Sequence, residues 1–284
     1  MLQTPENQIF DTEMYHDAII FSAIGFYILA TVFLFVSNTQ QSNSWRTVSI
    51  ISCFVGLVCH ALAQTMHWYS EASPDISLLS LLSLCSLVVV LMLCSTVFSR
   101  NSLYDASLVA LPLALIMLAL EEIIPSQNLL LHRVNTGTTL HILSSVTAFG
   151  LLSFAGVYAL LAAIIDFFLR RHHLNPFVRL LPPLETLERL LFRLLSLGFF
   201  LLTISLLTGL AFVSDLFAQH LAHKTILSIM AWLVFGLLLW GRWRYGWRGR
   251  YAVRMTLAGI VLLLLAYFGS KLVLENILGR SWHA

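Results

Sequence analysis

The sequence predicts an all-α, polytopic integral membrane protein with eight transmembrane helices and both termini outside the cytoplasm. Three observations support this fold class: the composition, the number of long apolar segments, and the distribution of charge between the loops. Of the 284 residues, 58% are hydrophobic and 11% are charged, whereas soluble domains contain about 45–50% apolar and roughly 25% charged residues. This composition excludes an ordinary soluble enzyme, a nucleic-acid-binding protein and a disordered chain.

Eight segments are long and apolar enough to cross a bilayer, which requires about 20 helical residues. These segments are residues 18–37, 47–66, 76–98, 103–120, 139–165, 194–213, 225–241 and 255–275. The first segment does not resemble a cleavable signal peptide, because its flank is acidic instead of basic. The fourth contains Pro112, which a membrane-spanning helix tolerates when neighbouring groups satisfy the freed carbonyl. We therefore expect one membrane domain over residues 1–284, with the lipid bilayer as its main partner.

The charged residues predict the orientation of the spans, because cytoplasmic loops of membrane proteins are enriched in Lys and Arg. With the N-terminus outside, the inner segments hold twelve basic and four acidic residues, a net +8. The outer segments hold four basic and ten acidic residues, a net −6. The outer basic residues are Arg133, Lys224, Lys271 and Arg280.

The longest segment between spans, residues 166–193, is predicted to be a cytoplasmic amphipathic linker. It contains Pro183 followed by "LETLERLLFRLL", with leucines at helical spacing. Proline suits the first position of a helix, so we expect a helix on the inner membrane surface that leads into the sixth span. A helix that docks a partner protein is the alternative interpretation.

No motif for covalent catalysis is present, and we predict that the protein is not an enzyme. The chain has no H-E-x-x-H, no G-x-S-x-G and no glycine-rich phosphate loop. Its four cysteines lie in apolar segments without a C-x-x-C pair, which indicates small buried residues and not a redox pair or a zinc site.

Histidines near the outer surface are the candidate binding residues, because ionisable side chains within spans are functional hypotheses by default. His60 lies in the second span, roughly 10 Å below the predicted outer boundary at about 1.5 Å per residue. His141 lies within about one turn of that boundary in the fifth span. Neutral imidazole is a common axial ligand of haem iron, so both are candidate iron ligands. The alternative is that each histidine only hydrogen-bonds across a helix interface.

A haem in the outer leaflet would place its propionates near the outer surface, where cations can neutralise them. Arg133, Lys224 and Lys271 are the outer basic residues near this position, and we take Arg133 and Lys224 as candidate haem-binding residues. His223 precedes the seventh span and is a further candidate.

The C-terminal half contains "LHILSSVTAFGLLSFAGVYALL", "PPLETLERLLFRLLSLGFFLLTISLLTG" and "HKTILSIMAWLVFGLLLWGRWRYGWRGRYAVRMTLAGIVLLLLAYFGSKLV". These segments resemble the cytochrome c assembly membrane-protein family of CcsA, ResC and CcmC-like proteins, and in particular its small eight-span branch of YpjD and HemX-type proteins. The resemblance covers roughly residues 45–275 and is most specific over 223–274.

The resemblance implies roles for particular residues. His141 is similar to an external histidine that opens a span, His60 to a histidine in an early span, and Lys224 to a lysine that precedes the following span. The tryptophan-rich loop of the larger relatives is absent from residues 214–223, and Trp240 stands where relatives place a histidine.

The resemblance also implies a function. It favours a bacterial inner-membrane protein that binds or passes haem, the suspected cofactor, near the outer leaflet and works with other cytochrome c assembly components. The alternatives are a membrane regulator or scaffold linked to haem metabolism, and a small-solute permease.

Overall fold

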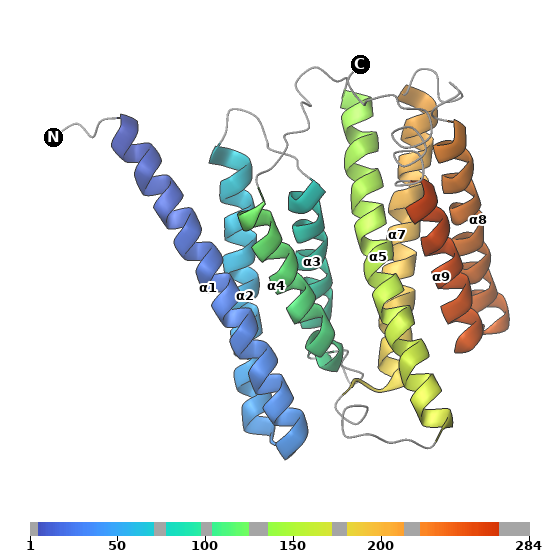
Figure 1. The fold of residues 1–284 in the computed structure, drawn as a ribbon, viewed down its shortest axis with the longest axis horizontal. Coiled ribbons are helices and arrows are strands. Elements are labelled where there is room, and N and C mark those ends of the chain that lie inside the picture. The colour runs from blue at the N-terminus through green and yellow to red at the C-terminus, as the bar shows by residue number, and fades with distance from the viewer. Residues whose placement is uncertain are drawn as a thin grey trace. The chain divides into compact units, whose positions relative to one another are not determined.

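The computed structural model describes residues 5–70, 78–97, 104–124, 136–171, 181–212 and 222–266. The chain divides into two compact units. Unit 1 comprises residues 1–133 and 174–186, and unit 2 comprises residues 134–173 and 187–284. Long helices make up nearly all of the described residues (Figure 1).

Within the described residues, unit 1 contains four α-helices and one short 3-10 helix. They are α1 (Pro5–Gln40), α2 (Asn43–Ser70), α3 (Leu78–Ser95), η1 (Tyr104–Ala106) and α4 (Ser107–Ile123). Helices α1 and α2 lie side by side and are joined by a two-residue link in which Gln41 adopts a positive φ of 51°. Pro112 lies inside α4, as a membrane helix tolerates.

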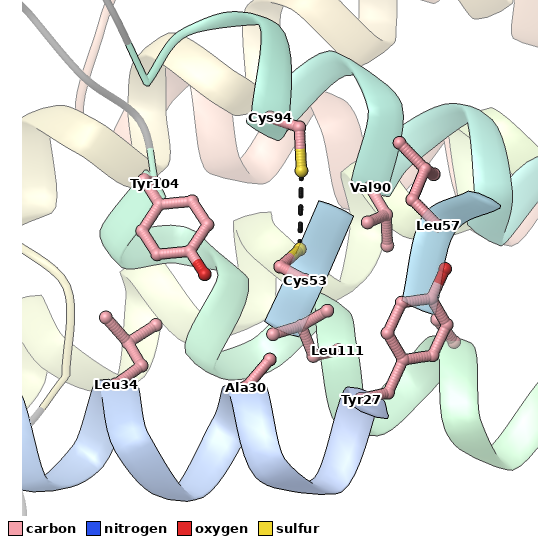
Figure 2. Close-up of a cluster of buried hydrophobic side chains, with 10 residues drawn as sticks. Tyr27, Ala30, Leu34, Cys53, Leu57, Val90, Cys94, Tyr104 and Leu111 are labelled. Carbon is pink, nitrogen blue, oxygen red and sulfur yellow. Dashed lines mark hydrogen bonds between the residues drawn. The ribbon is translucent and has the colours of Figure 1, made fainter. Parts of the chain in front are cut away.

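The core of unit 1 lies between these helices and combines aromatic, aliphatic and thiol side chains (Figure 2). Tyr27 and Leu34 of α1 pack there with Cys53 of α2 and Cys94 of α3. The Cys53 and Cys94 Sγ atoms are 3.3 Å apart and both residues are free thiols. The structure confirms that three of the four cysteines are buried; Cys59 is half-buried.

An ion pair closes one end of unit 1. Arg46 near the start of α2 donates to the carboxylate of Asp105 in η1 at 2.7 Å, and both side chains are partly buried. Ser49 Oγ lies 2.9 Å from the hydroxyl of Tyr104, one residue before Asp105. These contacts tie η1 to α2 at the predicted cytoplasmic end.

The described part of unit 2 contains α5 (Thr136–Arg170), most of α7 (Leu184–Phe212), α8 (Ala222–Tyr245) and α9 (Arg250–Leu264). Helices α8 and α9 approach closely because Gly259 has no side chain: a Cβ there would lie 2.5 Å from the ring of Phe235. Small residues at helix contacts allow this kind of packing in membranes.

The link between α8 and α9 is short and well bonded. Gly246 has φ +68° and its N–H donates to the carbonyl of Arg242 at 3.1 Å. A glycine in the left-handed conformation commonly ends an α-helix in this way. The N–H of Gly249, just before α9, donates to Glu188 Oε1 of α7 at 2.8 Å. A carboxylate at a helix N-terminus is favourable because it accepts a hydrogen bond from a free backbone amide and lies at the positive end of the helix dipole.

The helices bear out the predicted class, a polytopic all-α membrane protein. Within the described residues, six helices are long and apolar enough to cross a membrane. Two of the eight predicted spans fall short of that length: the apolar stretch of α3 covers Leu79–Ser95, and the described part of α9 has 15 residues. The prediction of a single membrane domain over residues 1–284 stays a prediction.

The predicted linker is partly described. Helix α7 begins at Leu184, directly after Pro183, and continues without a break through the predicted sixth span. Leu187, Leu190 and Leu194 are fully buried, which agrees with their helical spacing. Residues 172–180 of the linker lie outside the described residues, and its position on the inner membrane surface stays a prediction.

Candidate functional site

His141 lies in the second turn of α5 and its imidazole reaches across to α7. Nδ1 lies 2.8 Å from the backbone carbonyl oxygen of Ser205. A carbonyl oxygen only accepts hydrogen bonds, so Nδ1 carries the proton and donates. In the neutral imidazole Nε2 then keeps its lone pair, and no hydrogen bond joins it to another of the described residues. Metal-ligating histidines have this arrangement, with one nitrogen oriented by a backbone carbonyl and the other available.

Gly209, one helical turn after Ser205, makes room for this ring. A Cβ atom at Gly209 would lie 2.9 Å from Cε1 and 3.1 Å from Nδ1 of His141. Any side chain at this position would push the imidazole away from α7. The ring of His141 therefore lies against the glycine surface of α7, with its Nδ1 held by the Ser205 carbonyl.

Hydroxyl groups extend the contact between α5 and α7. Ser145 Oγ lies 2.7 Å from Ser205 Oγ and donates to the carbonyl of His141. Thr208 Oγ1 donates to the carbonyl of Ser205 at 3.0 Å. The backbone carbonyls of His141 and Ser205 thus each accept a hydrogen bond from a hydroxyl group, which restrains the position of the imidazole.

His60 has a different environment, inside unit 1. Its side chain is fully buried, and both of its ring nitrogens have a partner. Nδ1 lies 3.2 Å from the hydroxyl of Tyr27 on α1, and Nε2 lies 3.0 Å from Ser83 Oγ on α3. His60 would have to lose one of these hydrogen bonds before it could bind iron.

The polar contacts continue from His60 toward the end of α4. Gln64 Nε2 donates to Ser83 Oγ at 3.0 Å and to Glu121 Oε2 at 2.8 Å. Four helices each contribute to this chain, which links Tyr27 to Glu121. Buried polar groups of this kind are stable only when they are hydrogen-bonded, so the chain specifies how the four helices pack.

The predicted iron ligands lie in separate units. His60 belongs to unit 1 and His141 to unit 2, so their pairing around one iron stays a prediction. The chemistry of the donor set fits haem at His141, which offers a lone pair on an oriented ring. It fits less well at His60, which is enclosed and bonded at both nitrogens.

The other predicted site residues are only partly described. Lys224 lies in the first turn of α8 and is half-buried. His223 precedes it in the same helix, and its side chain lies outside the described residues, as does Arg133. Their predicted contacts with haem propionates stay predictions.

One group of potential metal ligands was not predicted from the sequence. His16 and Asp17 of α1 and Glu122 of α4 place one ligand atom each within 4.8 Å of one another. Asp17 and Glu122 are exposed, so water already solvates these carboxylates. No local sequence signal identifies this group, because Glu122 follows the adjacent His16 and Asp17 by about 105 residues along the chain.

The fold and the histidine environments define a multi-pass helical membrane protein with an oriented imidazole in unit 2. The family model described as "Cytochrome C assembly protein" matches residues 14–278, and the chain belongs to this family.

Its relatives agree with this assignment. The inner membrane protein YpjD of Escherichia coli K12 is 36% identical over 257 residues, which are 90% of this chain and 97% of the relative. An uncharacterised 28.8 kDa protein of Azospirillum brasilense is 38% identical over 142 residues, 49% of this chain and 52% of the relative. The cytochrome c biogenesis protein CcsA of Trichormus variabilis is 30% identical over 102 residues, 35% of this chain and 28% of the relative. No solved structure matches the chain. The predicted location in the inner membrane is confirmed.

Proposed function

We propose that this protein handles haem in the inner membrane and assists cytochrome c assembly, with His141 as the residue that binds the haem iron. Family membership and the similarity to CcsA support a role in cytochrome c biogenesis. The single observation that carries the haem assignment is the orientation of His141, whose Nδ1 is held by the Ser205 carbonyl at 2.8 Å.

Haem is the cargo in this proposal, and the protein performs no covalent chemistry on it. Nε2 of His141 would ligate the iron, and Gly209 would keep the ring close to α7. Lys224, Arg133 and His223 remain candidate contacts for the propionates or the iron, and His60 remains a candidate second ligand. Other cytochrome c assembly components are the proposed partners.

The proposal places the eight helices across the membrane with both termini outside, so that His141 lies near the outer surface. We expect a reporter that is active only outside the cytoplasm to be active when it is fused after residue 284. The net +8 of the inner segments and −6 of the outer segments is the physical reason. Activity of a cytoplasm-specific reporter at the same position would contradict this orientation and the outer location of His141.

An absorption spectrum of the protein purified in a mild detergent tests the haem assignment. We expect an intense haem band in the wild-type protein and its loss in His141→Gly, because the variant lacks the imidazole. Added imidazole should restore part of the band in His141→Gly, since the cavity left by the side chain admits a free ligand.

His16→Ala is the matched control, because His16 is also a partly exposed histidine but lies in unit 1. It should retain the wild-type haem content. A wild-type protein without haem, even after incubation with haemin, would contradict the proposed function. Equal haem content in wild type and His141→Gly would instead show that another residue is the ligand.

A further inference from the structure

The joint between α8 and α9, residues 240–254, carries a series of aromatic rings, most of them exposed. Ring centroids of Trp240 and Tyr245 are 5.4 Å apart, those of Tyr245 and Trp247 are 6.1 Å apart, and those of Trp247 and Tyr251 are 4.4 Å apart. Trp243 is 83% exposed and Tyr245 is 61% exposed. A continuous aromatic surface of this kind is typical of the boundary between lipid headgroups and acyl chains.

Five arginines lie in the same joint, and two of them are engaged within the protein. Arg242 donates to the carbonyl of Trp247 at 3.2 Å, and its guanidinium lies 4.6 Å from the ring centre of Phe192. Arg250 pairs with Asp166 at 2.7 Å. These two arginines therefore hold the joint against α5 and α7.

The other three arginines of the joint, Arg244, Arg248 and Arg254, are exposed. None of them forms an ion pair with another of the described residues. Among the described residues, the two carboxylates bonded to the joint are already engaged, because Asp166 binds Arg170 and Arg250 and Glu188 accepts from Gly249. The joint thus presents three guanidinium groups whose charge the adjacent carboxylates do not balance.

Two glycines and a hydrogen bond to α7 shape the backbone of the joint. Gly246 and Gly249 both adopt a left-handed φ, at +68° and +65°, which non-glycine residues rarely do. The bond from Gly249 to Glu188 attaches the start of α9 to α7. A ligand of the exposed arginines would therefore bind to side chains whose backbone is already ordered.

We propose that the α8–α9 joint binds the headgroup of an anionic phospholipid at the inner membrane surface, through Arg244, Arg248 and Arg254. Guanidinium groups bind phosphate oxygens in a bidentate manner, and the neighbouring tryptophan and tyrosine rings suit the depth of the headgroups. Clusters of cytoplasmic arginines near spans recognise anionic lipids for the same reason. The proposal rests on the orientation of the spans and not on haem.

Reconstitution of the full chain in nanodiscs tests this inference. The nanodiscs contain phosphatidylcholine alone or phosphatidylcholine mixed with phosphatidylglycerol, and native mass spectrometry then counts the lipids that stay bound. We expect wild type to retain phosphatidylglycerol selectively. The triple variant Arg244→Gln, Arg248→Gln, Arg254→Gln should bind it roughly 100-fold more weakly, at about fivefold for each arginine near the surface.

Arg170→Gln is the matched control, since Arg170 is an exposed arginine of unit 2 that pairs with Asp166. It should retain the lipid. The single variant Arg248→Gln, with a loss of about fivefold, provides the test if the triple variant fails to insert. Equal lipid retention in wild type and the variants would overturn the proposal. The proposal would also fail if inorganic phosphate raised the thermal stability of the wild-type protein as much as phosphatidylglycerol does, because the free anion would then be the ligand.

Discussion

Gly209→Ala is expected to reduce the haem retained on purification about 10–100-fold, while the helices stay folded. The new Cβ would lie 2.9 Å from Cε1 of His141, so the imidazole must move away from α7 and lose its bond to the Ser205 carbonyl. Loss of the group that orients a metal-ligating histidine typically lowers metal affinity by about this factor. The ratio of haem absorbance to protein concentration measures the effect.

Gly25→Ala provides the control for this substitution. Gly25 also lies within a helix, but a Cβ there would meet nothing within 4 Å. Alanine should therefore leave the haem content unchanged and stabilise α1 by about 0.5–1 kcal/mol, because glycine is the poorer helix former. If Gly209→Ala retains as much haem as Gly25→Ala, the close contact between Gly209 and His141 does not govern binding.

His60→Ala is expected to destabilise unit 1 strongly, by about 3–5 kcal/mol. The substitution removes a fully buried ring and leaves a cavity. It also removes the hydrogen-bond partner of the Tyr27 hydroxyl and one of the partners of Ser83 Oγ, and a buried polar group without a partner costs about 1–3 kcal/mol. This loss corresponds to a fall in Tm of about 6–20 °C. Thermal unfolding in detergent, monitored by tryptophan fluorescence, measures it.

Two further variants separate a structural role of His60 from iron ligation. Val58→Ala removes an exposed side chain two residues away and should change Tm little. Tyr27→Phe keeps the imidazole but removes one hydrogen bond, and should lower stability by about 1 kcal/mol. An unchanged Tm in His60→Ala together with a loss of bound haem would show that His60 acts as a ligand and not as a part of the core.

The helical class and the approximate spans follow from the sequence because lipid imposes a simple rule. Each spanning segment must satisfy its own backbone hydrogen bonds, so about 20 consecutive apolar residues form a helix whatever surrounds them. The start of α7 after Pro183 was predictable for a similar reason, since proline at a helix start is a local preference. The candidate importance of His60 and His141 also came from local information, namely an ionisable side chain within an apolar segment.

The environments of the two histidines could not be predicted in this way. His141 meets Ser205 and Gly209, which lie more than 60 residues later in the chain, and His60 meets Tyr27 and Ser83 from two other helices. No periodicity or spacing encodes such contacts, because they depend on which helix faces lie together and at what depth. The lack of a tryptophan-rich loop in residues 214–223 was readable from the sequence, but its consequence for binding was not.

The membrane character, the approximate helices, the bias in charge and the short list of histidines follow from the sequence alone, because each depends on composition or on residues close together in the chain. Only the packing of the helices reveals which nitrogen of His141 is bonded to the backbone, why a side chain at position 209 would displace the imidazole, and why His60 is enclosed. Hydrogen-bond partners and steric limits are properties of surfaces from different helices. They exist only once those helices pack.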